Sequence, residues 1–138
     1  PTLSPSYKVP PMMEGNPFFT DAIKEKARAA AAASKGNFRD AVDGGVNIAF
    51  GTDSGVTRHG DNADEFAFMV ENGMTPMQAI HSATVATADL LDQSESLGSI
   101  EPGKLADIIA VDTSPLDDIS ALEDVSVVIR DGVLEFRR

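Results

Sequence analysis

An aspartate between two glycines is the side chain in this sequence best placed to do chemistry. Asp53 lies in the sequence GTDSG at residues 51–55, directly after the apolar run IAF at residues 48–50. The short continuous run predicts a strand at residues 46–51 that is buried on both faces, and sites in parallel sheets lie at the carboxyl ends of the strands. An ionised carboxylate there can bind a metal or take a proton. The alternative is that Asp53 is only a turn or N-cap residue.

A polar loop at residues 56–62 follows the aspartate and carries Arg58 and His59. Loops at such an edge often hold binding residues, so both side chains are candidates for substrate contacts, with simple solvation as the alternative. The other histidine, His81, falls in a predicted helix without an acidic or histidine partner three or four positions away. We therefore expect His81 to be a hydrogen-bonded helix residue and not a metal ligand.

Charge and composition limit the classes of partner. The 138 residues include 11 basic and 22 acidic side chains, for a formal net charge of −11, which repels nucleic-acid phosphates and anionic lipids. No apolar run is long enough to cross a membrane. The sequence has no cysteine, which excludes disulfides, thiolate metal sites and a cysteine nucleophile. We expect a cytoplasmic protein with no nucleic-acid and no membrane partner.

The N-terminal part is predicted to form a loop and then helices. Five of the eight prolines fall in residues 1–17, so an extended loop is expected there, either at a truncation or as a flexible leader. An alanine-rich helix is predicted from about Phe19 to Ala33, with Thr20 or Asp21 as its cap. Residues 34–37 are expected to interrupt it before a short second helix that ends at the glycine pair 44–45.

Two more helices are predicted after the polar loop. Asp61 or Asn62 is expected to cap the first, which ends at residues 72–73. Thr75, followed by Pro76, is expected to cap the second, which runs to Leu91.

Beyond residue 92 the pattern changes to short strands and turns. Strands are predicted at residues 106–111, 125–129 and 133–136, with a type II turn at residues 101–104 and a hairpin turn at Asp131-Gly132. We therefore predict an α/β unit at residues 1–92 and a small β unit at residues 93–138.

Three passages together resemble the amidohydrolase superfamily of metal-dependent hydrolases, especially its imidazolonepropionase-like and Xaa-Pro dipeptidase-like members. Residues 41–55 are similar to the last barrel strand of the family, where an aspartate after Gly-Thr binds metal. The sequence GMTPMQAI at residues 73–80 is similar to the helix after that strand. The sequence LGSIEPGKLADII at residues 97–109 is similar to the C-terminal β-sandwich and is the most specific of the three.

The resemblance implies an α/β fold: the C-terminal part of a TIM-type (β/α)8 barrel at residues 1–92, followed by a small β-sandwich segment at residues 93–138. It implies hydrolysis of a C–N bond in a peptide, cyclic amide or amidine. The attacking water would be activated by one or two divalent ions, and we expect these to be zinc. Asp53 would be a metal ligand and the proton acceptor, and Ser54, Arg58 and His59 would face the substrate. The substrate would be a small or dipeptide-like molecule.

The family's other metal ligands lie on earlier barrel strands, and of its ligand set only Asp53 is in this sequence. The chain therefore resembles the C-terminal third of an enzyme, inactive alone, that would self-associate or bind a missing N-terminal barrel portion. A non-catalytic fragment or interaction remnant is the alternative.

Overall fold

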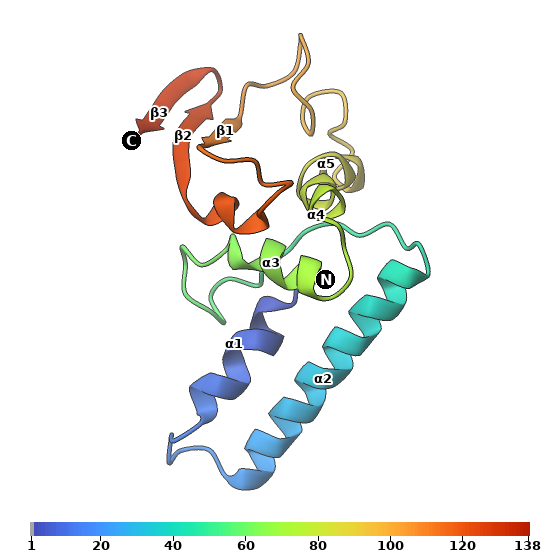
Figure 1. The fold of residues 1–138 in the computed structure, drawn as a ribbon, viewed down its shortest axis with the longest axis vertical. Helices are drawn as coiled ribbons and strands as arrows, with labels where there is room; N and C mark the ends of the chain where they lie inside the picture. The colour runs from blue at the N-terminus through green and yellow to red at the C-terminus, as the bar shows by residue number, and fades with distance from the viewer. Residues whose placement is uncertain (1) are drawn as a thin grey trace.

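The computed structural model describes residues 2–138, in which two long helices at one end are joined through short helices to a small sheet at the other (Figure 1). The helices are α1 (Ser4–Met13), α2 (Asp21–Asp43), α3 (Asp64–Glu71), α4 (Pro76–Ala83), α5 (Val85–Leu90) and the 3-10 helix η1 (Ile119–Glu123). The strands are β1 (Ile108–Val111), β2 (Val125–Arg130) and β3 (Val133–Arg137). None of the described helices is long and apolar enough to span a membrane.

Helix α1 overturns the prediction of an extended loop over residues 1–17, of which Pro1 lies outside the described residues. Pro5 falls in the first turn, where a missing N–H costs nothing, while Pro10 and Pro11 are inside the helix. Tertiary contacts offset the cost of the inner prolines. The ring of Tyr7 stacks on Phe68 of α3, with centroids 4.0 Å apart. A buried carboxylate of α3 also caps the N-terminus of α1.

Helix α2 is continuous, so the predicted interruption at residues 34–37 is wrong. Gly36 costs about 1 kcal/mol in a helix relative to alanine. The neighbouring residues supply packing that outweighs this cost, because Phe38 is buried and the Lys35 ammonium lies 3.3 Å from the centroid of the Tyr7 ring. Thr20 caps the helix as predicted, and the helix ends before Gly44.

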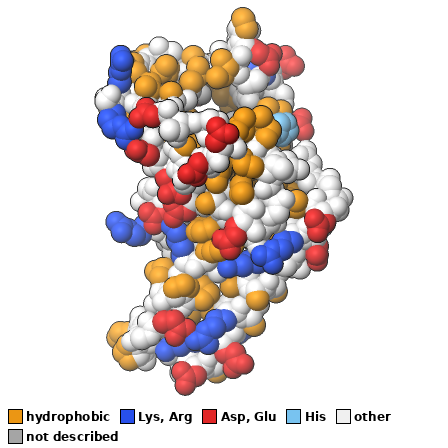
Figure 2. All heavy atoms as spheres, in the orientation of Figure 1, with side chains coloured by type: hydrophobic (Ala, Val, Ile, Leu, Met, Phe, Trp, Pro, Cys, Tyr) orange, Lys and Arg blue, Asp and Glu red, His pale blue; other side chains and the backbone are white. Residues whose placement is uncertain are grey.

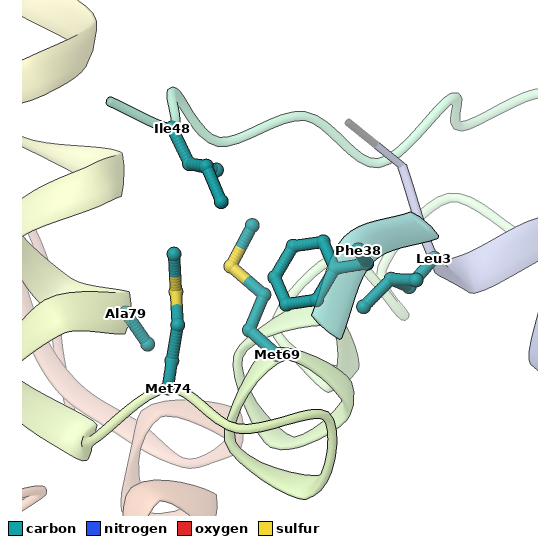
Figure 3. Close-up of a cluster of buried hydrophobic side chains, with 6 residues drawn as sticks. All are labelled: Leu3, Phe38, Ile48, Met69, Met74 and Ala79. Atoms are coloured by element: carbon teal, nitrogen blue, oxygen red, sulfur yellow. The ribbon is translucent and has the colours of Figure 1, made fainter. Parts of the chain in front are cut away.

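The core lies where α1, α2, α3 and α4 meet the segment after α2 (Figure 3). Its buried members come from residues far apart in the sequence and point toward one another: Leu3, Phe38, Ile48, Met69, Met74 and Ala79. The core therefore fixes the segment that leads to Asp53 against the helices.

The segment at residues 46–51 is not a strand within the described residues. Only Ile48 is buried, and Val46 is 58% exposed, so the expected burial on both faces is also wrong. A strand needs a ladder partner, and here the Phe50 N–H instead donates to the Ser82 carbonyl at 3.0 Å. A cavity of about 960 Å³, lined largely by apolar residues of α2, α5 and this segment, lies beside it.

The helix predicted from Thr75 to Leu91 is two helices with a corner at Thr84, where φ is −119° and ψ is −90°. The predicted cap is present, since Thr75 and Gln78 form a capping box. The Thr84 hydroxyl donates to the Ile80 carbonyl at 2.8 Å, which offers the backbone an alternative to the helical ladder. The corner leaves the Ser82 carbonyl free to accept from Phe50.

The C-terminal strands form one antiparallel sheet in the order β1–β2–β3. The strands lie within two residues of their predicted positions, and Asp131 and Gly132 both have positive φ, as a type I′ hairpin requires. The type II turn is confirmed by the positive φ of Gly103 and by the Lys104 N–H bond to the Glu101 carbonyl. The described residues contain a single sheet, so the second sheet of a sandwich is not among them.

Glycine is required where the β unit meets the helices. Gly98 has a φ of +91°, and a Cβ there would lie 2.8 Å from the Cβ of Ala88 in α5. Helix η1 packs on α3 as a second link. The described chain is thus a mixed α/β structure without the parallel sheet that was predicted.

Candidate functional site

Asp53 ends the extended segment with its carboxylate exposed. Its φ is +53°, in the left-handed region that costs a non-glycine residue about 1 kcal/mol or more. Its carbonyl accepts from the Val56 N–H at 3.2 Å. Within residues 2–138 its carboxylate has no hydrogen bond or ion pair, so Asp53 is not the N-cap of a helix. An exposed carboxylate without a partner, on a residue whose backbone is strained, is suited to binding a ligand.

A polar cluster flanks Asp53 on both sides. The hydroxyl oxygens of Thr52 and Ser54 are 3.0 Å apart, and the Asn62 side-chain amide donates to Ser54 Oγ at 2.8 Å and to Thr52 Oγ1 at 3.3 Å. The prediction that Asp61 or Asn62 caps α3 is wrong, because that helix has no side-chain cap. No local pattern predicts the cluster, because Asn62 lies eight residues beyond Ser54 and reaches it only through the closed loop.

The loop closes on itself before α3. The Gly55 N–H donates to the Thr57 carbonyl at 3.0 Å, and the Gly60 N–H donates to Asn62 Oδ1 at 3.1 Å. Arg58 and His59 are exposed on this loop. No hydrogen bond or ion pair joins either side chain to Asp53 or Ser54 in the described part of the chain. The fold thus places Asp53, Ser54, Arg58 and His59 on one loop.

An ion-pair cluster ties the end of this loop to α1. Lys8 Nζ is 2.9 Å from Asp61 and 2.6 Å from Asp64. Desolvation lowers the pKa of Lys8, but the hydrogen bonds and charges of Asp64 and Asp61 outweigh it, so the net pKa is raised. The hydrogen bond from Lys8 lowers the pKa of Asp61, and the charge of Arg58 adds to the effect. Sequence reasoning missed this link because it placed Lys8 in a loop.

His81 lies on α4 with its side chain exposed. The predicted hydrogen bond from its side chain is not found among residues 2–138.

The described residues can supply one ligand of a metal site but not a complete site. No group of three or more His, Cys, Asp or Glu residues that could hold a metal ion is found in residues 2–138. Structural and catalytic zinc sites use three or four protein ligands. The free, acceptor-only carboxylate of Asp53 suits one of those positions.

Comparison with known proteins gives similar structures over nearly the whole chain. A solved structure described as a Xaa-Pro dipeptidase with bound methionine in the active site matches 99% of this chain at 50% identity, with a TM-score of 0.91. A putative prolidase from Bifidobacterium longum matches 99% of the chain at 32% identity, with a TM-score of 0.88. The chain covers 34% of each of those two chains.

Sequence comparison gives a consistent result. Ochratoxinase from Aspergillus niger is 38% identical over 93 residues, which are 66% of this chain and 19% of ochratoxinase. The chain thus spans a fifth to a third of the relatives that it matches. The model of the amidohydrolase family matches residues 22–134, more than half of the chain. The resemblance inferred from the three sequence passages is confirmed, and the chain belongs to the amidohydrolase family.

Proposed function

We propose that this chain is the C-terminal part of a metal-dependent hydrolase that cleaves the amide C–N bond of small, dipeptide-like substrates. The observation that carries the proposal is the exposed, unpaired carboxylate of Asp53, held with positive φ at the end of the extended segment. Membership of the amidohydrolase family supports the reaction class. The 50% identity with a Xaa-Pro dipeptidase supports a peptide substrate.

In this proposal Asp53 is both a metal ligand and the group that handles the proton. A bound divalent cation, zinc by expectation, would supply the positive charge that activates water and polarises the scissile carbonyl. Asp53 accepts a proton from the attacking water and delivers it to the leaving nitrogen, as a general base and then a general acid.

The loop after Asp53 is proposed to contact the substrate. Ser54 offers a hydroxyl next to Asp53, and Arg58 and His59 are exposed farther along the same loop. A guanidinium forms strong, paired hydrogen bonds with a carboxylate, so Arg58 suits the free carboxylate of a dipeptide. His59 is a candidate for the peptide carbonyl or a second polar group of the substrate.

The remaining metal ligands must come from outside residues 2–138. We propose that a barrel portion beyond these residues supplies them and pairs with the extended segment at residues 46–51. We further propose that residues 1–92 belong to the barrel and residues 93–138 to the accessory β-sandwich, in a cytoplasmic enzyme. The net charge of −11 argues against nucleic-acid and anionic-membrane partners.

The test is hydrolysis of the dipeptide Met-Pro by the intact enzyme that contains this chain. We expect release of methionine and proline, loss of activity after treatment with a chelator, and recovery with zinc. Release of ammonia from adenine with no cleavage of Met-Pro would replace the peptidase proposal by a deaminase. No metal-dependent turnover of either compound would favour the non-catalytic alternative.

A further inference from the structure

We infer that Asn62 is a positioning residue for Asp53: its amide group ties together the hydroxyls on either side of Asp53 and so fixes the direction of the carboxylate. The inference rests on the proposed function, because positioning matters only if Asp53 takes part in catalysis. In this inference Asn62, at the far end of the loop, affects catalysis through Thr52 and Ser54 and does not contact the substrate.

The contacts that carry the inference converge on the residues next to Asp53. Asn62 Nδ2 lies 2.8 Å from Ser54 Oγ and 3.3 Å from Thr52 Oγ1, and the two hydroxyl oxygens are 3.0 Å apart. Thr52 and Ser54 are the residues directly before and after Asp53, so these contacts restrain the backbone on both sides of it.

Asp53 needs such support because nothing else in the described chain orients its side chain. Its carboxylate has no hydrogen bond or ion pair in residues 2–138, and its φ of +53° is a strained conformation. Backbone strain persists only where surrounding contacts overdetermine it. The Asn62 amide provides that restraint across residues 52–54, together with the Val56 N–H bond to the Asp53 carbonyl.

Asn62 can act as a fixed point because it is anchored to α3 and α1. Its carbonyl accepts from the Glu65 N–H at 3.3 Å, and its Oδ1 accepts from the Gly60 N–H. The preceding residue, Asp61, is held by Lys8 of α1. The restraint on Asp53 thus runs from the helices through Asn62 to the two hydroxyls.

The test is Asn62→Ala in the intact enzyme, with Met-Pro as the substrate. Because a misplaced catalytic group slows the reacting complex, we expect kcat to fall about 10- to 100-fold. KM is expected to stay within about twofold, since no substrate contact is removed. The hydrogen bonds of Asn62 are exposed, so Tm is expected to fall by no more than about 2 °C. Asn16→Ala is the matched control, because Asn16 is an asparagine whose side-chain oxygen accepts an exposed hydrogen bond, from the Phe18 N–H.

A double-mutant cycle with Ser54→Ala separates positioning from general loosening of the loop. If Asn62 acts through the Ser54 hydroxyl, Asn62→Ala lowers kcat far less in the Ser54→Ala background than in the wild type. Full additivity of the two effects on kcat, or a kcat of Asn62→Ala equal to wild type, would overturn the inference. A loss of kcat matched by a loss of folded protein would overturn it as well.

Asp53→Asn in the same assay separates the positioning role of Asn62 from the proposed function. If Asp53→Asn has activity close to wild type, the proposed function itself is refuted. If Asp53→Asn is inactive while Asn62→Ala is fully active, only the positioning role is refuted.

Discussion

The carboxylate of Glu65 accepts a hydrogen bond from the backbone N–H of Ser4 at 2.7 Å, although 61 residues separate the two in the sequence. The same carboxylate accepts from the Leu3 N–H and the Ser4 hydroxyl, both at 2.6 Å, and Glu65 is fully buried. A negative side chain at the N-terminus of α1 satisfies free N–H groups and interacts favourably with the helix dipole. This contact docks α1 on α3, next to the loop that carries the candidate site.

Glu65→Gln is expected to destabilise the protein. The amide keeps the shape of the side chain but turns an N–H group toward donors that need an acceptor, so we expect a loss of about 1.5–3 kcal/mol in the free energy of unfolding. Urea unfolding followed by circular dichroism measures it. Glu95→Gln, on an exposed residue, is the control and is expected to change stability by less than about 0.5 kcal/mol. Equal stability of the two variants would show that the buried contact contributes nothing.

The ion pairs of Lys8 predict a pH dependence of stability. The pKa of Asp61 is lowered in the folded state, so its contribution is present above the unfolded pKa, near 3.8, and is lost as pH falls through the folded value. The pKa of Lys8 is raised, so its contribution is present below the unfolded pKa, near 10.5, and is lost as pH rises through the folded value.

We therefore expect Lys8→Met to have a lower Tm than wild type at neutral pH, with the difference shrinking below about pH 3.8 and far above pH 10.5. Thermal melts across this pH range measure the difference. Lys26→Met removes an exposed lysine without an ion pair among the described residues and serves as the control. A Tm difference that does not change with pH would assign the effect to packing of the side chain.

Asp53→Asn is expected to lower the turnover number of the intact enzyme by at least ~100-fold while the protein stays folded, because the amide keeps the shape but cannot accept the proton. Steady-state hydrolysis of Met-Pro measures it. Asp131→Asn is a matched control, since Asp131 also has positive φ and asparagine suits a hairpin turn equally well. Activity of Asp53→Asn within a few fold of wild type would indicate that Asp53 is only a turn residue.

The chain of residues 1–138 alone is expected to hydrolyse no Met-Pro and to hold no stoichiometric zinc, because one carboxylate cannot supply the three or four ligands of such a site. Metal analysis of the purified chain and a hydrolysis assay measure these two properties. About one tightly bound zinc per chain, with activity lost to a chelator, would contradict the expectation and point to ligands shared between copies.

The same chain is expected to self-associate unless the proposed barrel portion is present. Hydrophobic side chains gather on the visible face around the sheet (Figure 2), and Ile100, Leu134 and Phe136 are each about half exposed or more. Each large apolar side chain left in water forfeits roughly 1.5–3 kcal/mol relative to burial. Light scattering and thermal unfolding test this. A monodisperse monomer with a sharp cooperative transition would refute the truncated-barrel interpretation.

The sequence by itself determined the features that depend on a few neighbouring residues. The caps at Thr20 and Thr75, the turn at Gly103 and the hairpin at Asp131 were all predictable, because each is set by the side chain and φ preference of one or two residues. The three passages also identified the family. The position of Asp53 directly after an apolar run was enough to make it the leading candidate for chemistry.

Only the tertiary structure decided the features whose stability comes from distant residues. Helix α1 forms despite two inner prolines because Glu65, which lies 61 positions beyond Ser4, caps it. Asn62 does not cap α3. Its side-chain amide donates instead to the hydroxyls of Thr52 and Ser54, the residues next to Asp53, which the closed loop brings within reach. Residues 46–51 have the pattern of a buried strand but no ladder partner in the described chain, because strand pairing depends on a second segment that no local pattern can provide.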